Sequence, residues 1–296
     1  MSPALLMVFA SFGFASMGVC VKLASAHYAP GEIMFYRGLV GAVLMLVLAR
    51  SRGVPLATSV PSAHFWRSLS GVVAMLMWFY ALGKLPLATA MTLNYMSSVW
   101  MALFLIGGAA MLGAARVDGR LVATVLVGFA GVALILRPTI EHDQLWHGLV
   151  GLISGMISAT AYLQVTALAR AGEPEMRIVF YFSLGGVAFG LLTTLWSGIH
   201  AHTLQGAALL VAVGLLATAS QLMMTRAYST GRTLVNASLQ YLGIAFSFGY
   251  GVLLFSDRVT WMALAGMLLI VGAGLSATRL RTLSAPADTA NAPLES

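Results

Sequence analysis

Charged residues are scarce in this sequence. Asp, Glu, Lys and Arg make up only 8% of its 296 residues, whereas 59% are hydrophobic and the mean hydropathy is +0.90. A soluble globular chain carries roughly 25% charged residues. The composition therefore excludes water as the main solvent of this chain. The Lys and Arg residues are scattered singly rather than clustered on a basic face, so we expect no nucleic-acid partner.

Cysteine is also nearly absent. The single cysteine, Cys20, lies inside the first apolar run, so the chain cannot form an intrachain disulfide. We expect Cys20 to pack as a small hydrophobic side chain. The histidines have no recognised metal-binding spacing, and we predict no metal site and no cofactor.

Long apolar runs make up most of the sequence. Stretches of about 20 apolar residues recur along nearly the whole chain, which is the signature of transmembrane helices. Turn-forming residues separate them, for example at Ala29-Pro30-Gly31 and Arg137-Pro138. The sequence therefore predicts an all-α polytopic membrane protein with ten transmembrane helices. The predicted spans are residues 3–22, 32–49, 65–83, 88–107, 121–136, 147–168, 178–196, 205–225, 233–255 and 260–278.

Basic residues indicate the orientation of these spans. With the N-terminus in the cytoplasm, the cytoplasmic ends receive Arg50, Arg52, Arg67, Arg116, Arg120, Arg170, Arg177, Arg226, Arg232, Arg279 and Arg281, and the outer ends receive Lys22, Lys84, Arg137 and Arg258. This asymmetry follows the positive-inside rule. It predicts a multi-pass protein of the cell inner membrane with both termini in the cytoplasm and a disordered tail over residues 284–296.

Short segments of the first half recur in the second half in the same order. Phe35-Tyr36 matches Phe180-Tyr181, and residues 81–95 resemble residues 227–241, with Asn94-Tyr95 aligned on Gln240-Tyr241. A repeat of five spans enters the membrane from opposite sides in its two copies, an architecture that many transporters share. We therefore expect two inverted five-helix repeats, residues 1–138 and 139–283, around a central cavity.

Particular residues also carry a family resemblance. They are Lys22, Pro30, Arg37, Tyr80-Ala81-Leu82 and Leu87-Ala88-Thr89-Ala90 in the first half, and Phe255-Ser256-Asp257-Arg258-Val259-Thr260-Trp261 in the second. On these residues the chain resembles the EamA-type ten-helix exporters of the drug/metabolite transporter superfamily, which include the YddG-like amino-acid exporters. Asp257 stands at the usual acidic position of that pattern. Ala115 and Ser98 depart from it, standing where an acid and a proline are common.

The resemblance implies a function. It implies a transporter, and not an enzyme, that exports amino acids or related small metabolites by alternating access. The partners that follow are a small-molecule substrate and the lipid bilayer, and we expect a monomer. A channel-like pore for small solutes and an intramembrane enzyme are the alternatives.

Polar and aromatic residues near mid-span are the candidates for substrate binding, because they would be costly if they faced hydrocarbon. The candidates are Asn94, Tyr95 and Ser98 on the fourth span, Ser238, Gln240 and Tyr241 on the ninth, and the aromatic residues Trp78, Tyr80, Trp100 and Tyr162. In an inverted repeat the fourth and ninth spans would converge near the two-fold axis. Hydrogen bonding between helices and ordinary packing are the alternatives for each residue.

Arg37 is predicted to lie about one turn inside the second span. A buried arginine needs a partner or water. Glu32 could pair with it as a structural ion pair, or Arg37 could receive a substrate carboxylate.

No acidic residue is predicted at the middle of a span. All nine acids fall at span ends, in loops or in the tail, and the six histidines fall at the two faces. An intramembrane hydrolase would need, for example, paired acids or a serine with a base, and a proton carrier would need a buried carboxylate. The sequence therefore predicts facilitated or weakly coupled transport. No charged ring or filter-like motif supports a channel.

Overall fold

The computed structural model describes residues 1–111, 123, 126–128, 130–131, 134, 145–231, 236, 239–257 and 260–283. Every regular element in these ranges is helical. The helices are α1 (Pro3–Ala24), α2 (Pro30–Ser51), α3 (Pro61–Lys84), α4 (Leu87–Tyr95), α5 (Ser97–Met111), α7 (Leu145–Arg170), α8 (Glu175–Ser197), α9 (Leu204–Thr230), α11 (Leu242–Phe255) and α12 (Trp261–Leu283).

Six of the described helices are long and apolar enough to cross a membrane. They are α1, α2, α3, α7, α8 and α9, each with at least 22 residues. The apolar helices Leu242–Phe255 and Trp261–Ala273 are shorter. The predicted fifth span, residues 121–136, falls largely outside the described residues. The all-helical membrane architecture is confirmed, and the number of ten spans stays a prediction.

Proline begins several of these helices. Pro3, Pro30 and Pro61 each occupy the first helical turn, where the missing N–H has no intrahelical partner to lose. At α1 the Ser2 hydroxyl also accepts a hydrogen bond from the Leu5 N–H at 3.3 Å. The predicted break at residues 29–31 is therefore a helix start at Pro30.

The predicted fourth span is helical but interrupted at one residue. The structure has α4 and α5 in its place, with Met96 between them. The Thr92 hydroxyl donates to the Ala88 carbonyl oxygen at 2.6 Å, an arrangement that bends helices. The ninth predicted span is interrupted as well, because Gln240 and Tyr241 form a turn before α11. The two segments that match in sequence are thus both interrupted beside their matching residues.

Glycines allow the closest helix contacts. A Cβ atom added at Gly190 of α8 would lie 2.5 Å from the Phe35 nitrogen of α2, and one added at Gly155 of α7 would lie 2.5 Å from the Leu93 oxygen of α4. Backbones approach this closely only where a side chain is missing. The small-residue positions on α7 and α8 therefore serve packing.

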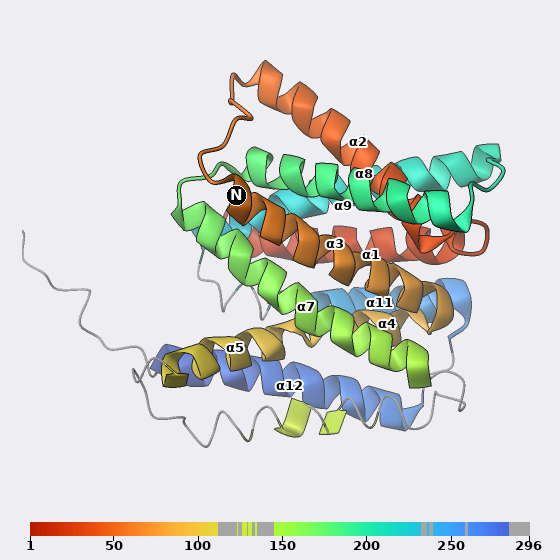
Figure 1. The fold of residues 1–296 in the computed structure, drawn as a ribbon. Helices are drawn as coiled ribbons and strands as arrows, with labels where there is room; N and C mark the ends of the chain where they lie inside the picture. Colours follow the sequence, from red (N-terminus) through yellow and green to blue (C-terminus); the bar gives the residue numbers. More distant parts are fainter. Residues whose placement is uncertain are drawn as a thin grey trace, which may run out of the picture.

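Helices from the first half of the chain pair with helices from the second half. The most extensive contacts join α2 to α8, α1 to α9 and α3 to α7. In Figure 1, α2 lies at one edge of the bundle, α12 at the opposite edge, and α1, α3 and α7 lie between them. The central hydrophobic core draws on α1, α3 and α4 together with α9 and α11. Trp196 and Trp261, at helix ends, are 94% and 86% exposed, as expected of residues at a membrane interface.

Candidate functional site

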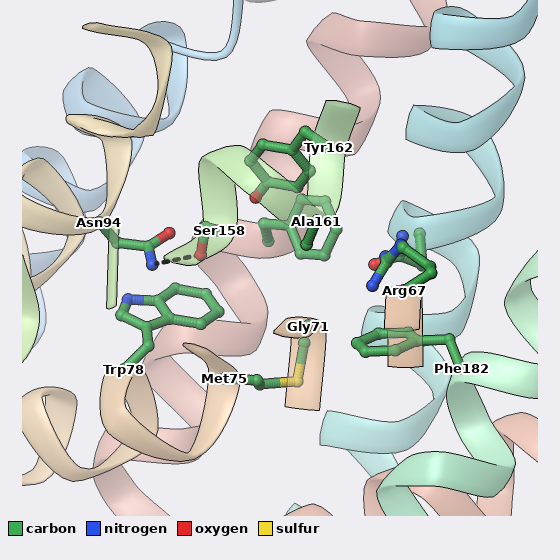
Figure 2. A pocket seen from close by; sticks show the side chains of 11 residues that line it. Arg67, Gly71, Met75, Trp78, Asn94, Ser158, Ala161, Tyr162 and Phe182 are labelled. Carbon is green, nitrogen blue, oxygen red and sulfur yellow. Dashed lines mark hydrogen bonds between the residues drawn. The ribbon is translucent and has the colours of Figure 1, made fainter. Parts of the chain in front are cut away.

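A small cavity lies at the centre of the bundle. Its volume is about 40 Å³, and Figure 2 shows the side chains around it. The lining residues are Phe14 from α1, Arg67, Gly71, Met75 and Trp78 from α3, Asn94 from α4, Ser158, Ala161 and Tyr162 from α7, Phe182 from α8 and Gln221 from α9. Helices on both sides of the chain's midpoint therefore supply its walls. Three of the predicted site residues meet here: Trp78, Asn94 and Tyr162.

Asn94 is held by two serines of α7. Its Nδ2 donates to Ser154 Oγ at 2.9 Å and to Ser158 Oγ at 3.3 Å, and Ser154 Oγ donates onward to the Ala74 carbonyl oxygen at 3.0 Å. The dashed line in Figure 2 marks the bond from Asn94 to Ser158, both of which line the cavity. This chain of bonds fixes the last turn of α4 against α3 and α7.

Aromatic side chains form one wall of the cavity. Tyr162 stacks on Tyr228 of α9 with ring centroids 6.1 Å apart. Tyr95 and Tyr241 lie near this pair. The predicted residues Tyr95, Tyr162 and Tyr241 are thus brought together through Tyr228, which the sequence analysis did not single out.

Two arginines share one aromatic ring at the other side of the cavity. The guanidinium carbons of Arg37 and Arg67 lie 4.5 Å and 4.3 Å from the centroid of Phe182. Both arginines are 2% exposed. Arg67 lines the cavity, and Arg37 reaches Phe182 from α2.

Glu32 does not pair with Arg37. Its carboxylate instead accepts a hydrogen bond from His200 Nδ1 at 2.8 Å and lies 3.4 Å from His202 Nε2. In the part of the chain that the structure describes, no set of three or more His, Cys, Asp or Glu side chains is arranged to hold a metal ion. Of the two roles open to Arg37, the ion pair with Glu32 is therefore absent from this structure.

A second buried acid lies at the other end of the bundle. Glu173, in the turn before α8, bonds to His64 Nε2 at 2.9 Å, Arg177 Nη1 at 3.0 Å and Thr58 Oγ1 at 2.9 Å. Burial raises the pKa of Glu173, but the bonds from His64, Thr58 and Arg177 outweigh it, and the pKa lies below its ordinary value. Because α2 and α3 run in opposite directions, the clusters at Glu32 and His64 close opposite ends of the bundle (Figure 1).

The remaining predicted residues lie away from the cavity lining. The Tyr80 hydroxyl bonds to His147 Nδ1 at 2.9 Å near the helix ends, and Trp100 stacks on Phe104 at 6.3 Å. Gln240 Nε2 contacts Met224 Sδ at 3.5 Å. The Tyr241 hydroxyl lies beside Ser98. Ser238 lies outside the described residues.

Arg67 is the main residue that the sequence analysis assigned to another role. It served there as a marker of the cytoplasmic face, because the third span was predicted to begin at residue 65. The helix begins at Pro61, so Arg67 lies nearly two turns inside it and is buried. Pro61 was the signal that could have revealed this, since proline favours the first helical turn.

Comparison with known proteins identifies the family. The sequence profile of the EamA-like transporter family matches residues 1–137. The pseudopaline exporter CntI of Pseudomonas aeruginosa strain UCBPP-PA14 is 32% identical over 281 residues, covering 95% of this chain and 97% of the relative. This chain belongs to the EamA-like transporter family. An uncharacterized transporter of Helicobacter pylori strain J99 is 24% identical over 280 residues, covering 91% of this chain and 92% of the relative.

The fold is shared with a solved structure. A solved structure described as "Crystal structure of protein" has a TM-score of 0.69 and 19% identity, and the match covers 96% of this chain and 99% of that chain. At this identity the match shows a shared fold. From its family and its relatives, the chain is a multi-pass membrane transporter of the drug/metabolite transporter superfamily with a small-molecule substrate, and this family and these relatives are transporters rather than enzymes.

Proposed function

We propose that this EamA-like protein exports an amino acid or a related small metabolite across the inner membrane by alternating access. The observation that carries the proposal is the cavity itself. It lies between helices of both halves of the chain, because α1, α3 and α4 as well as α7, α8 and α9 contribute to its lining. A site between two groups of helices is what a rocking transporter needs. The export activity named for the Pseudomonas relative agrees with this direction.

The helix pairing supports two inverted repeats. If residues 1–138 and 139–283 are equivalent, α1 corresponds to α7 and α3 to α9. The α1–α9 and α3–α7 pairs then exchange under a two-fold axis, and the α2–α8 pair lies on it. These three pairs make the most extensive helix contacts in the described part of the chain.

The size of the cavity supports a closed conformation. Sites for drug-sized ligands usually occupy about 300–1,000 Å³, far more than the 40 Å³ here. The substrate therefore enters only after the walls separate. The histidine and acid clusters around Glu32 and Glu173 are the contacts that must break at the two ends. One chain contains the whole cavity, which agrees with a monomeric transporter.

Weak coupling to protons remains our proposal for energetics. No carboxylate is among the residues that line the cavity in the described part of the chain. The buried acids Glu32 and Glu173 lie at helix ends, already bonded to histidines. A proton carrier at the substrate site is therefore not part of the proposed mechanism.

Counterflow in proteoliposomes tests the proposal. Vesicles loaded with unlabelled pseudopaline or amino acids should accumulate the same labelled compound from outside, with little change when a proton gradient is imposed. Trp78→Ala should slow this exchange, because Trp78 forms part of the cavity wall, whereas Trp146→Ala, at an exposed helix end, should not. Ionic currents far above carrier turnover would instead indicate a channel. Absence of saturable exchange for every compound would remove the transport proposal.

A further inference from the structure

Arg37 and Arg67 present buried guanidinium groups that the protein leaves incompletely bonded. In each residue Nε and Nη1 are buried and have no hydrogen-bond acceptor among the described residues. Neither arginine forms an ion pair with a described carboxylate. The two buried acids, Glu32 and Glu173, are bonded to histidines and, for Glu173, to Arg177.

The contacts that Arg37 and Arg67 do make do not offset the free-energy cost of burying their charges. Phe182 attracts both cations through its ring face. Removing a charge from water costs more than one such contact returns, and two neighbouring positive charges also repel each other. An arrangement of this kind is stable where an anion completes it.

The surroundings of Arg67 leave room for its guanidinium group next to the cavity. A Cβ atom at Gly71 would collide with Arg67 Nη1 and would lie 2.8 Å from Phe182 Cε2. Figure 2 shows Arg67 over the Phe182 ring, across the cavity from Asn94 and Trp78. The cationic side of the cavity is thus separate from its aromatic and amide side.

The geometry points to a carboxylate-binding site at Arg67, with Arg37 as a second positive charge on the same Phe182 ring, and therefore to an anionic, carboxylate-bearing metabolite as the substrate class. A guanidinium group donates two parallel hydrogen bonds to a carboxylate. Two neighbouring guanidinium groups favour a solute with a net negative charge over a zwitterion, because the ammonium group of a zwitterion offsets the charge of its one carboxylate. Arg67 contacts the substrate in the cavity. Arg37, on the same ring, adds a second positive charge. This assignment rests on the proposed function, because it takes the cavity as the substrate path.

Matched ligand pairs test the assignment by binding. The purified protein is heated in detergent with glutamate or glutamine, with aspartate or asparagine, and with citrate, all at equal ionic strength. Glutamate, aspartate and citrate should raise the unfolding temperature more than the two amides. Apparent affinity for the acids should fall about 10–100-fold in Arg67→Gln and Arg37→Gln, and recover in part in Arg67→Lys.

Arg50→Gln is the matched control, because Arg50 is an exposed arginine of α2. It should keep the wild-type preference for the acids. A purely structural role for the arginines would lower the unfolding temperature of Arg67→Gln in every ligand equally and leave the ratio of acid to amide binding unchanged, which overturns the assignment. Equal stabilisation by glutamate and glutamine, or stabilisation by no carboxylate, also overturns it.

Counterflow separates this inference from the proposed function. Saturable exchange without preference for anionic solutes leaves the transporter proposal intact and removes the carboxylate site. Arginine-dependent binding of carboxylates without any exchange keeps the site and removes the transport proposal.

Discussion

Asn94 illustrates how single residues in this protein combine structural and functional roles. Its side chain borders the cavity, yet its amide group is bonded to Ser154 and Ser158. The sequence analysis left binding and interhelical bonding open for this residue. The structure contains the hydrogen bonds from Asn94 to the neighbouring helix. Because Asn94 also lines the cavity, substrate binding by this residue stays a proposal.

The first prediction concerns Asn94→Ala. The substitution leaves the hydroxyl of Ser158 without its partner and loosens α4, so we expect a loss of about 1–3 kcal/mol in the free energy of unfolding. Thermal unfolding in detergent measures it. Ser70→Ala on α3 is a control, because that hydroxyl is partly exposed and outside the network. If Asn94→Ala matches this control in stability, the anchoring role is incorrect.

The second prediction concerns Gly71→Ala. The added methyl group meets the Arg67 guanidinium and the Phe182 ring, so Arg67 must move away from its place at the cavity. We expect weaker binding of glutamate, by about tenfold, with a smaller change for glutamine. The measurement is the ligand-dependent unfolding temperature described above. An unchanged acid preference in Gly71→Ala would mean that Arg67 acts from another position.

The third prediction concerns the charge of Glu173. Its folded-state pKa lies below the ordinary value, so the ionised group stabilises the folded protein above that value, and the stabilisation is lost as the pH falls through the lowered pKa. Glu173→Gln should therefore unfold at a lower temperature than the wild type near pH 7, with a loss of about 1.5–3 kcal/mol in the free energy of unfolding. The gap between variant and wild type should narrow as the pH falls below the ordinary pKa of a glutamate and through the lowered pKa of Glu173. A gap that is constant from pH 7 to pH 3.5 contradicts the charge-based explanation.

At the scale of whole helices, glycine decides how closely α2 and α8 pack. The Gly190 position faces the backbone of Phe35 and the carbonyl oxygen of Gly31, which cannot move aside as a flexible side chain can. Helix propensity would favour alanine here. The packing requirement outweighs that preference.

The fourth prediction follows from this contact. Gly190→Ala should separate α2 from α8 and destabilise the protein by about 1–3 kcal/mol, measured as a fall in the unfolding temperature. Gly249→Ala on α11 is the matched control, because no heavy atom lies within 4 Å of the position its Cβ would take. Equal stability of the two variants would show that α2 and α8 tolerate a wider spacing.

An apolar run in the sequence does not reveal where a helix is interrupted. Residues 88–107 form one apolar run in sequence but two helices in the structure, because a run shows that a segment meets lipid and not that its axis is straight. The helix starts at Pro30 and Pro61 could be predicted from the sequence, because proline acts through local backbone geometry.

At the scale of the whole molecule, two clusters of acid and histidine side chains lie at opposite ends of the bundle. Glu32 with His200 lies at one end, and Glu173 with His64 at the other. Alternating access requires that each end opens in turn.

The fifth prediction tests both ends. In a Cys20→Ser background, Glu32→Cys with His200→Cys, or His64→Cys with Glu173→Cys, is bridged by a short bifunctional thiol reagent. Each bridge alone should reduce counterflow to background, and each single-cysteine variant treated with the same reagent should keep its exchange. Full exchange with either bridge in place would show that this end does not open during transport.

The amino-acid sequence by itself determined the solvent, the helical class and the family of this protein, because apolar runs, proline breaks and residue matches are local properties of the chain. It also indicated Trp78, Asn94 and Tyr162 as candidate site residues, because they are polar or aromatic residues inside apolar spans. The tertiary structure decided that these three share a cavity. It also decided that Arg67 is buried beside them and that Glu32 pairs with histidines rather than with Arg37. Which face of a helix points inward, and which distant side chain it meets, depends on how helices far apart in the sequence pack.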